Sequence, residues 1–159
     1  MSIIKISVIT ITYNAENVIM RTLDSVLKQT FSNIEHIIID GASKDSTLLA
    51  EREYESRSCS TNNGHEIKII SEPDKGLYDA MNKGIGKATG NYLVFLNAGD
   101  VFPSSSTLET VADMIGDGEE LPGVLFGDTN IVDDNGNFLR HRRLSPPSHL
   151  NWRSFMFGM

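Results

Sequence analysis

Apolar positions along this chain alternate between two spacings, one typical of strands and one typical of helices. Short runs rich in β-branched residues and bounded by turn residues predict strands, and apolar residues three and four apart predict helices. The predicted strands are residues 5–12, 34–39, 67–70, 91–96 and 123–126. The predicted helices are residues 16–29, 48–55, 76–88 and a segment that begins after residues 104–106 and ends at 115. Strands that alternate with helices predict an α/β fold, with a mostly parallel mixed sheet flanked by helices.

Turn and cap residues complete this pattern. Asn14 is expected to cap the first helix, and the polar residues 56–65 are expected to form a loop. Residues 130–140 predict a hairpin, because Asp134-Asn135-Gly136 contains the Asn-Gly dipeptide that favours tight hairpin turns.

Polar residues follow the early strands where each one ends. Thr12-Tyr13-Asn14 follows the first strand, Asp40 ends the second, and Ser71-Glu72-Pro73-Asp74 follows the third. Parallel strands bring these residues to one edge, where open α/β sheets bind ligands. There Tyr13 is suited to stacking on a planar ring, and Asp40 to accepting hydrogen bonds from a base or ribose. Each residue alone is more typical of a cap or a turn, but their joint placement favours a nucleotide site.

The segment Tyr92–Asp100 carries the candidate metal ligand. Its apolar residues predict a buried strand, and the small or turn-prone Asn97, Ala98 and Gly99 lead to Asp100. A single carboxylate at this edge suits a hard divalent cation that shares the phosphates of a substrate. The alternative is an aspartate that only turns the chain.

Composition excludes several other classes. The length of 159 residues suits one domain, and a net charge of -7 argues against nucleic acid as a partner. The single cysteine, Cys59, allows no internal disulfide, so we expect a cytoplasmic protein, with neither a leader peptide nor a membrane span. The sequence has no P-loop, no G-x-G-x-x-G after the first strand, and no zinc spacing among its histidines.

Several ordered motifs resemble the family 2 glycosyltransferases, which have the GT-A fold. They are SVITITYN (7–14), LDSVLKQTF (23–31), EHIIIDGASKDST (35–47), EPDKGLYDAMNKG (72–84) and ATG (88–90). Residues 97–100 stand where that family carries its Asp-x-Asp region, and the resemblance spans roughly residues 5–140.

This resemblance implies an inverting transferase that uses a nucleotide-diphospho-sugar donor and a divalent cation, Mn²⁺ or Mg²⁺. It implies a saccharide or lipid-linked acceptor, and leaves peripheral membrane association and oligomeric state open. The implied donor-site residues are Tyr13 and Asp40 at the base and ribose, Thr12 nearby, Lys75 and Asn82 along the nucleotide pocket, and Asp100 at the metal. From its place after the strand predicted at 123–126, Asp128 is expected either to face the donor sugar or to turn the chain.

Two departures from the family pattern shape these expectations. Asn97 and Gly99 replace acidic residues of the metal motif, so the cation would depend on Asp100 and on the diphosphate of the donor. The general base of the family lies well downstream of that motif, whereas this chain ends at Met159 after the apolar segment 151–159. We therefore expect the donor-binding half of a longer enzyme, with its catalytic base undetermined. The alternatives are a short protein that dimerises through this tail, a non-catalytic nucleotide-binding module and a nucleotidyltransferase.

Overall fold

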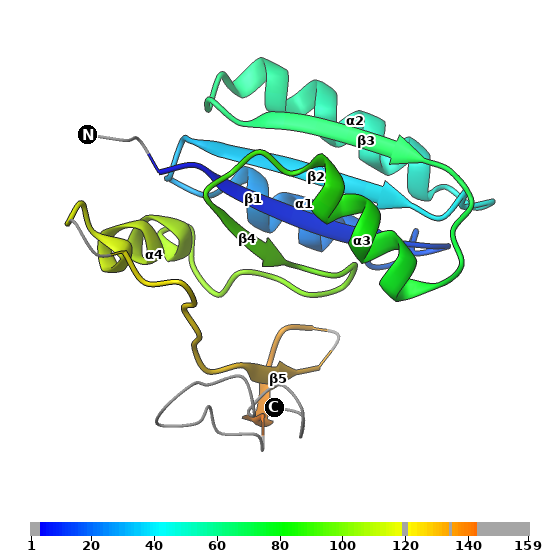
Figure 1. Ribbon diagram of the computed structural model, residues 1–159. Coiled ribbons are helices and arrows are strands. Elements are labelled where there is room, and N and C mark those ends of the chain that lie inside the picture. The colour runs from blue at the N-terminus through cyan, green and yellow to red at the C-terminus, as the bar shows by residue number, and fades with distance from the viewer. Residues whose placement is uncertain (1–3, 119–120, 134, 143–159) are drawn as a thin grey trace. The chain divides into compact units, whose positions relative to one another are not determined.

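A computed structural model describes residues 4–118, 121–133 and 135–142 (Figure 1). The chain forms two compact units, Met1–Gly118 and Glu119–Met159, and each is described by itself. The predicted single domain stays a prediction.

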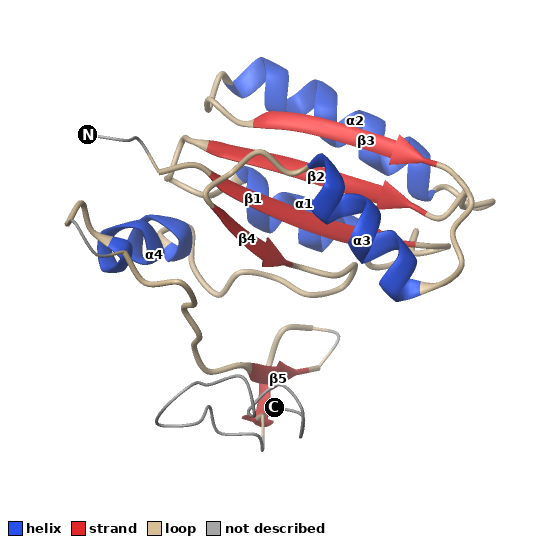
Figure 2. Ribbon diagram, viewed as in Figure 1, coloured by secondary structure: helices blue, strands red, loops and turns tan. Residues whose placement is uncertain are grey.

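The first unit is a four-stranded parallel sheet with helices on both faces (Figure 2). Its strands lie in the order β3-β2-β1-β4. They are β1 (Ile6–Thr12), β2 (Ile34–Asp40), β3 (Glu66–Ser71) and β4 (Tyr92–Phe95), and the helices are α1 (Ile19–Leu27), α2 (Thr47–Thr61), α3 (Leu77–Lys87) and α4 (Thr107–Ile115). This architecture confirms the predicted α/β fold.

The two central strands hold the core. Every residue of β1 and β2 is buried, as expected for strands covered on both faces. On one face, Ile38 packs with Leu23 of α1 and Tyr54 of α2. On the other, Ile9 and Ile39 pack against α3, which also places Gly84 against Ile9. Helices α1 and α2 thus pack on one face of the sheet, and α3 packs on the other.

The strand predicted as buried before Asp100 is instead half exposed. Among the described residues β4 pairs only with β1, so it is an edge strand, and Leu93 and Phe95 are 45% and 37% exposed. The run of apolar residues identified a strand correctly but did not reveal its place in the sheet.

Two local predictions around the helices are wrong. Helix α2 continues to Thr61, over the first part of the loop expected at residues 56–65. Its C-cap is Asn62, which has left-handed backbone geometry. Its polar residues suggested a loop, but Ser58 is buried against the rest of the unit. Asn14 does not cap α1; its side-chain oxygen accepts a hydrogen bond from the Lys44 backbone N–H at 2.9 Å.

The second unit contains the predicted hairpin, formed by β5 (Asn130–Val132) and β6 (Phe138–His141), which pair antiparallel. The strand predicted at 123–126 does not form; residues 124–129 have no regular structure. Pro122 and two glycines, Gly123 and Gly127, lie in or beside this segment and disfavour an ordered strand. The apolar segment 151–159 lies outside the described residues. Across the described part of the chain, no helix has the length and apolar character needed to cross a membrane.

Candidate functional site

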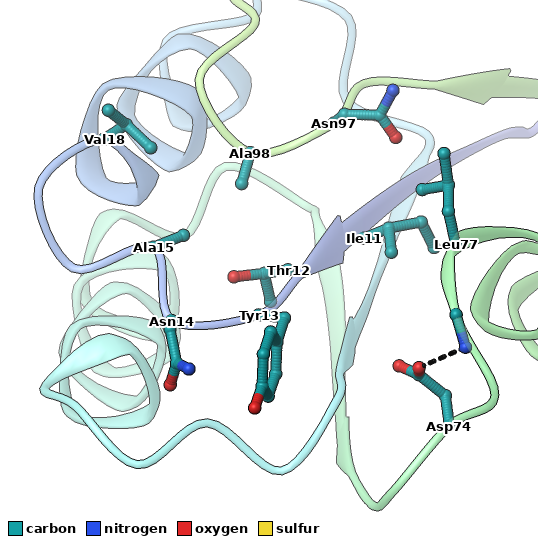
Figure 3. A pocket seen from close by; sticks show the side chains of 11 residues that line it. Ile11, Thr12, Tyr13, Asn14, Ala15, Val18, Asp74, Leu77, Asn97 and Ala98 are labelled. Carbon is teal, nitrogen blue, oxygen red and sulfur yellow. Dashed lines mark hydrogen bonds between the residues drawn. The ribbon is translucent and has the colours of Figure 1, made fainter.

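A cavity of about 480 Å³ lies at the carboxyl-terminal edge of the parallel sheet (Figure 3). Three segments that are far apart in the sequence form its wall. The first contributes residues 11–15 and Val18, the second Asp74, Gly76 and Leu77, and the third Asn97 and Ala98. Its size falls within the range of small-molecule sites, and its place is the one where open α/β sheets bind ligands.

Reciprocal hydrogen bonds fix the loop after β1 to the loop after β2. The Asn14 backbone N–H donates to Ser43 Oγ at 2.8 Å, while Lys44 N–H donates back to Asn14 Oδ1. Further along, the Ala15 N–H donates to Thr47 Oγ1 at 2.8 Å. Asn14 adopts a positive φ of 47°, which asparagine tolerates better than most residues. These contacts hold Tyr13, the residue between β1 and Asn14, in place at the wall of the cavity.

Asp40 is an anchor for these loops and does not line the cavity. Its side chain is fully buried, and its carboxylate accepts hydrogen bonds from the Ser43 N–H at 3.1 and 3.2 Å and from the Ser43 hydroxyl. Ser71 Oγ, at the end of β3, donates to Asp40 Oδ2 at 2.5 Å. The carboxylate thereby joins the ends of β2 and β3 to the Ser43 loop. Its predicted contact with a base or ribose stays a prediction.

A second buried acid shares this environment. Glu51 of α2 is fully buried, and neither carboxylate oxygen has a hydrogen-bond partner in the described structure. Burial, together with the nearby Asp40 carboxylate, raises the pKa of Glu51 to about 8. At neutral pH the carboxyl group of Glu51 is therefore mostly protonated.

Tyr13 and Asp74 approach each other over Gly41. A Cβ atom at residue 41 would lie 2.6 Å from Asp74 Oδ2 and 3.2 Å from Tyr13 Cδ2. Asp74 is fixed on its other side, because its Oδ1 accepts the Gly76 N–H at 2.8 Å (Figure 3). Tyr13 remains 60% exposed, so much of its ring is open to a ligand. The pair forms an aromatic surface beside a carboxylate.

Two oxygen atoms of the cavity wall have no partner. Thr12 Oγ1 and Asn97 Oδ1 are buried and make no hydrogen bond within the described structure. A buried polar atom without a partner costs roughly 1–3 kcal/mol, so native proteins seldom leave one unpaired. Both atoms lie in residues that line the cavity, which suits them to contact a polar ligand there.

The other predicted site residues lie outside the cavity wall. Lys75, between the lining residues Asp74 and Gly76, is exposed, as are Asn82 on α3 and Asp100 after the lining residue Ala98. Asp128 is an exposed residue of the second unit, so its contact with a donor sugar stays a prediction. The sequence reasoning did not select Asp74 or Leu77 as site residues, although the polar end of β3 had pointed to the first.

These residues suit a cation that is shared with a ligand. No group of three or more His, Cys, Asp or Glu side chains within the described ranges is arranged to hold a metal ion. Asp100 offers one exposed carboxylate, and the unpaired Asn97 Oδ1 offers one neutral oxygen. Mg²⁺ commonly keeps several waters and completes its coordination with substrate phosphates, which fits so small a set of protein oxygens.

A profile described as glycosyl transferase family 2 matches residues 7–157. The chain belongs to this family. It is 36% identical over 129 residues to a PGL/p-HBAD biosynthesis glycosyltransferase of Mycobacterium tuberculosis, covering 81% of this chain and 48% of the relative. It is 32% identical over 160 residues to the amylovoran biosynthesis glycosyltransferase AmsB of Erwinia amylovora, covering 98% of this chain and 51% of the relative. The chain thus spans about half the length of these curated relatives.

Solved glycosyltransferase structures share the fold of this family member. S. aureus TarS 1-349 in complex with UDP-GlcNAc is 28% identical, with a TM-score of 0.59 over 70% of this chain and 31% of that one. The mannosyltransferase PcManGT from Pyrobaculum calidifontis, in complex with GDP-Man and Mn²⁺, is 28% identical, with a TM-score of 0.60 over 72% of this chain and 33% of that one. The GT-A fold implied by the sequence motifs is confirmed.

Proposed function

We propose that this chain binds the nucleotide-diphospho-sugar donor of a glycosyltransferase and, in its whole protein, serves transfer of the sugar to an acceptor hydroxyl. The observation that carries the proposal is the cavity at the carboxyl-terminal edge of the sheet, with its exposed Tyr13 ring and its two unpaired oxygens. The relatives crystallised with UDP-GlcNAc and with GDP-Man and Mn²⁺ support this class of ligand.

Each wall of the cavity suits one part of such a donor. In this proposal the ring of Tyr13 stacks on the base, and the Thr12 hydroxyl forms a hydrogen bond with the base or the ribose. Asp40 acts on the donor through the loops that it holds, because Ser43 and Ser71 already occupy its oxygens. Asn97 and Asp100 lie on the loop after β4 and are suited to the metal-bound diphosphate, and Lys75 to its negative charge.

The proposed reaction is an inverting displacement. The acceptor oxygen forms a bond to the anomeric carbon, the bond from that carbon to the diphosphate breaks, and the hydroxyl proton passes to a base that we do not assign. A divalent cation, when bound, neutralises the charge that develops on the departing nucleoside diphosphate. The residues of this chain bind and orient the donor.

Calorimetric titration of the 159-residue chain with UDP and GDP, each with and without Mn²⁺, tests this proposal. We expect at least one nucleotide to bind, and to bind more tightly with Mn²⁺. Tyr13→Ala should weaken that binding, whereas Tyr78→Ala removes an equally large ring that is 79% exposed and does not line the cavity, and should have little effect. A folded chain that binds neither nucleotide would rule the proposal out.

A further inference from the structure

No described residue that lines the cavity carries a positive charge. Among the residues that line it, Asp74 is charged and none is lysine or arginine. A nucleoside diphosphate is strongly anionic, so the proposed donor requires cations at its phosphates. A bound metal supplies one, but Asp100 is the only acidic residue in the loop 97–100 that would hold it.

Arg21 lies beside this loop. It belongs to the first turn of α1, and one of its terminal guanidinium nitrogens is 3.3 Å from the position that a Cβ at Gly99 would take. Val18, which lines the cavity, is a neighbour of the same position at 3.7 Å. The guanidinium therefore occupies the side of the Asn97–Asp100 loop where residue 99 has no side chain.

A hydrogen bond joins the loop 97–100 to helix α1 next to Arg21. The Gly99 backbone N–H donates to Thr22 Oγ1 of α1 at 2.8 Å, and Thr22 is fully buried. Gly99 has a φ of 101°, a conformation that glycine accepts readily and other residues rarely adopt. This arrangement fixes the distance between the backbone of Arg21 and the loop.

The charge of Arg21 is not used elsewhere in the first unit. Its side chain is exposed, and within residues 4–118 no carboxylate forms an ion pair with it. By contrast, Arg57 pairs with Asp24 at 2.9 Å and Arg52 with Glu55 at 3.2 Å. An unpaired guanidinium is well suited to phosphate, because its planar donors match two phosphate oxygens at once.

We propose that Arg21 binds the diphosphate of the nucleotide donor next to the loop 97–100. This inference rests on the proposed function, and assigns to its site a second protein cation beside Lys75, in addition to the metal. It follows that part of the affinity for a nucleoside diphosphate persists when divalent cations are removed, and that this part falls as salt concentration rises.

Titration with a nucleoside diphosphate and with its nucleoside, in EDTA and in Mn²⁺, tests the role of Arg21. The probes are UDP with uridine and GDP with guanosine. Arg21→Gln should weaken diphosphate binding in EDTA about tenfold, the effect expected for one charged hydrogen-bonded contact, and leave nucleoside binding unchanged. Arg21→Lys should retain part of the affinity. Arg52→Gln removes a guanidinium that already has a partner, and should bind both ligands like wild type.

The outcomes separate this inference from the proposed function. Unchanged diphosphate affinity in Arg21→Gln, or a wild-type chain that binds no diphosphate in EDTA, would overturn the role of Arg21 and leave the donor site standing. An equal loss of nucleoside and diphosphate affinity in a folded Arg21→Gln variant would also contradict it, because the residue would then act on the cavity and not on the phosphates. Failure of the wild-type chain to bind any probe in either buffer would overturn both proposals.

Discussion

The two ends of the parallel sheet differ in how completely their buried polar groups are hydrogen-bonded. Near the amino-terminal end, Glu35 of β2 is fully buried and accepts hydrogen bonds from four residues. These are Ser7 Oγ at 2.5 Å, Lys68 Nζ at 2.6 Å, the Gly90 N–H at 2.9 Å, and the N–H and hydroxyl of Thr89. At the carboxyl-terminal end, Thr12 Oγ1 and Asn97 Oδ1 belong to residues that line the cavity, and neither atom has a hydrogen-bond partner among the described residues.

This contrast separates residues that hold the fold from residues that are available to a ligand. Glu35 joins β1, β2, β3 and the turn before β4, which explains the ATG motif at residues 88–90 as a structural one. Gly90 is needed there, because a Cβ at this position would lie 2.5 Å from Ser7 Oγ. Asp40 resembles Glu35 in being satisfied within the protein, although it lies at the end of the sheet that carries the cavity.

The largest effect is expected from Glu35→Gln. Burial alone would raise the pKa of Glu35, but the bonds from Lys68, Ser7 and Thr89 outweigh it and lower the pKa from 4.5 to about 2. The carboxylate therefore stabilises the fold above pH 4.5, and this stabilisation is lost as the pH falls toward 2. We expect urea unfolding at pH 7 to give a free energy of unfolding roughly 3 kcal/mol lower for the variant than for wild type. When the pH is lowered below 4.5, the free energy of unfolding should fall less for the variant than for wild type.

Glu66→Gln is the matched control. Glu66 is 60% exposed and pairs with Lys5 at the surface, so its loss should cost less than about 1 kcal/mol. If the two variants were equally stable, the interpretation of Glu35 as the structural centre of this end of the sheet would be wrong.

Glu51→Gln tests the buried acid near Asp40, whose two carboxylate oxygens have no hydrogen-bond partner among the described residues. The pKa of Glu51 is about 8 in the folded protein and 4.5 ordinarily. Between pH 4.5 and 8, unfolding therefore releases the proton of Glu51, and the stability of the wild type falls as the pH rises. The facing charges are Asp40 and Asp45, which raise the pKa, and Arg52, which lowers it. The variant should gain stability relative to wild type from pH 5 to pH 8, on the order of 2 kcal/mol. Glu53→Gln, an exposed change on the same helix, should show no such trend in chemical unfolding at the two pH values.

Gly41→Ala moves the cavity wall without removing a polar group. The added Cβ pushes the Asp74 side chain aside and crowds Tyr13. We expect the fold to tolerate the change while nucleotide affinity falls about tenfold, or about 1.4 kcal/mol. Gly86→Ala adds a methyl group where nothing lies within 4 Å, in the last turn of α3, and should leave affinity unchanged. Equal affinities for these two variants in calorimetry would show that the Tyr13–Asp74 surface does not contact the base.

Sequence reasoning located the four strands of the parallel sheet and the Tyr13 ring, because these depend on local patterns. The apolar runs of β1 and β2 are buried on both faces, and Tyr13 follows directly from the end of β1. It could not show that Asp40 is already satisfied, since Ser71 lies 31 residues away and reaches it only through the sheet register. The length of α2 was missed for a similar reason, because the burial of Ser58 depends on tertiary packing and not on the polarity of its neighbours.

The smallest and most discriminating effect is expected from Thr12→Val, compared with Thr10→Val in the same strand. Thr10 Oγ1 lies 2.8 Å from His36 Nε2 in the buried core, whereas Thr12 Oγ1 has no hydrogen-bond partner in the described part of the chain. Thr10→Val should therefore cost roughly 1 kcal/mol of stability and leave nucleotide binding unchanged. Thr12→Val should keep or slightly raise stability and weaken binding about fivefold, the value of one neutral hydrogen bond. Thermal unfolding and calorimetry of both variants measure the two effects.

A Thr12→Val variant that lost stability but bound nucleotide like wild type would contradict this prediction. The Thr12 hydroxyl would then be a structural group like those around Glu35, and the distinction between hydrogen-bonded and unpaired oxygens would fail at this position.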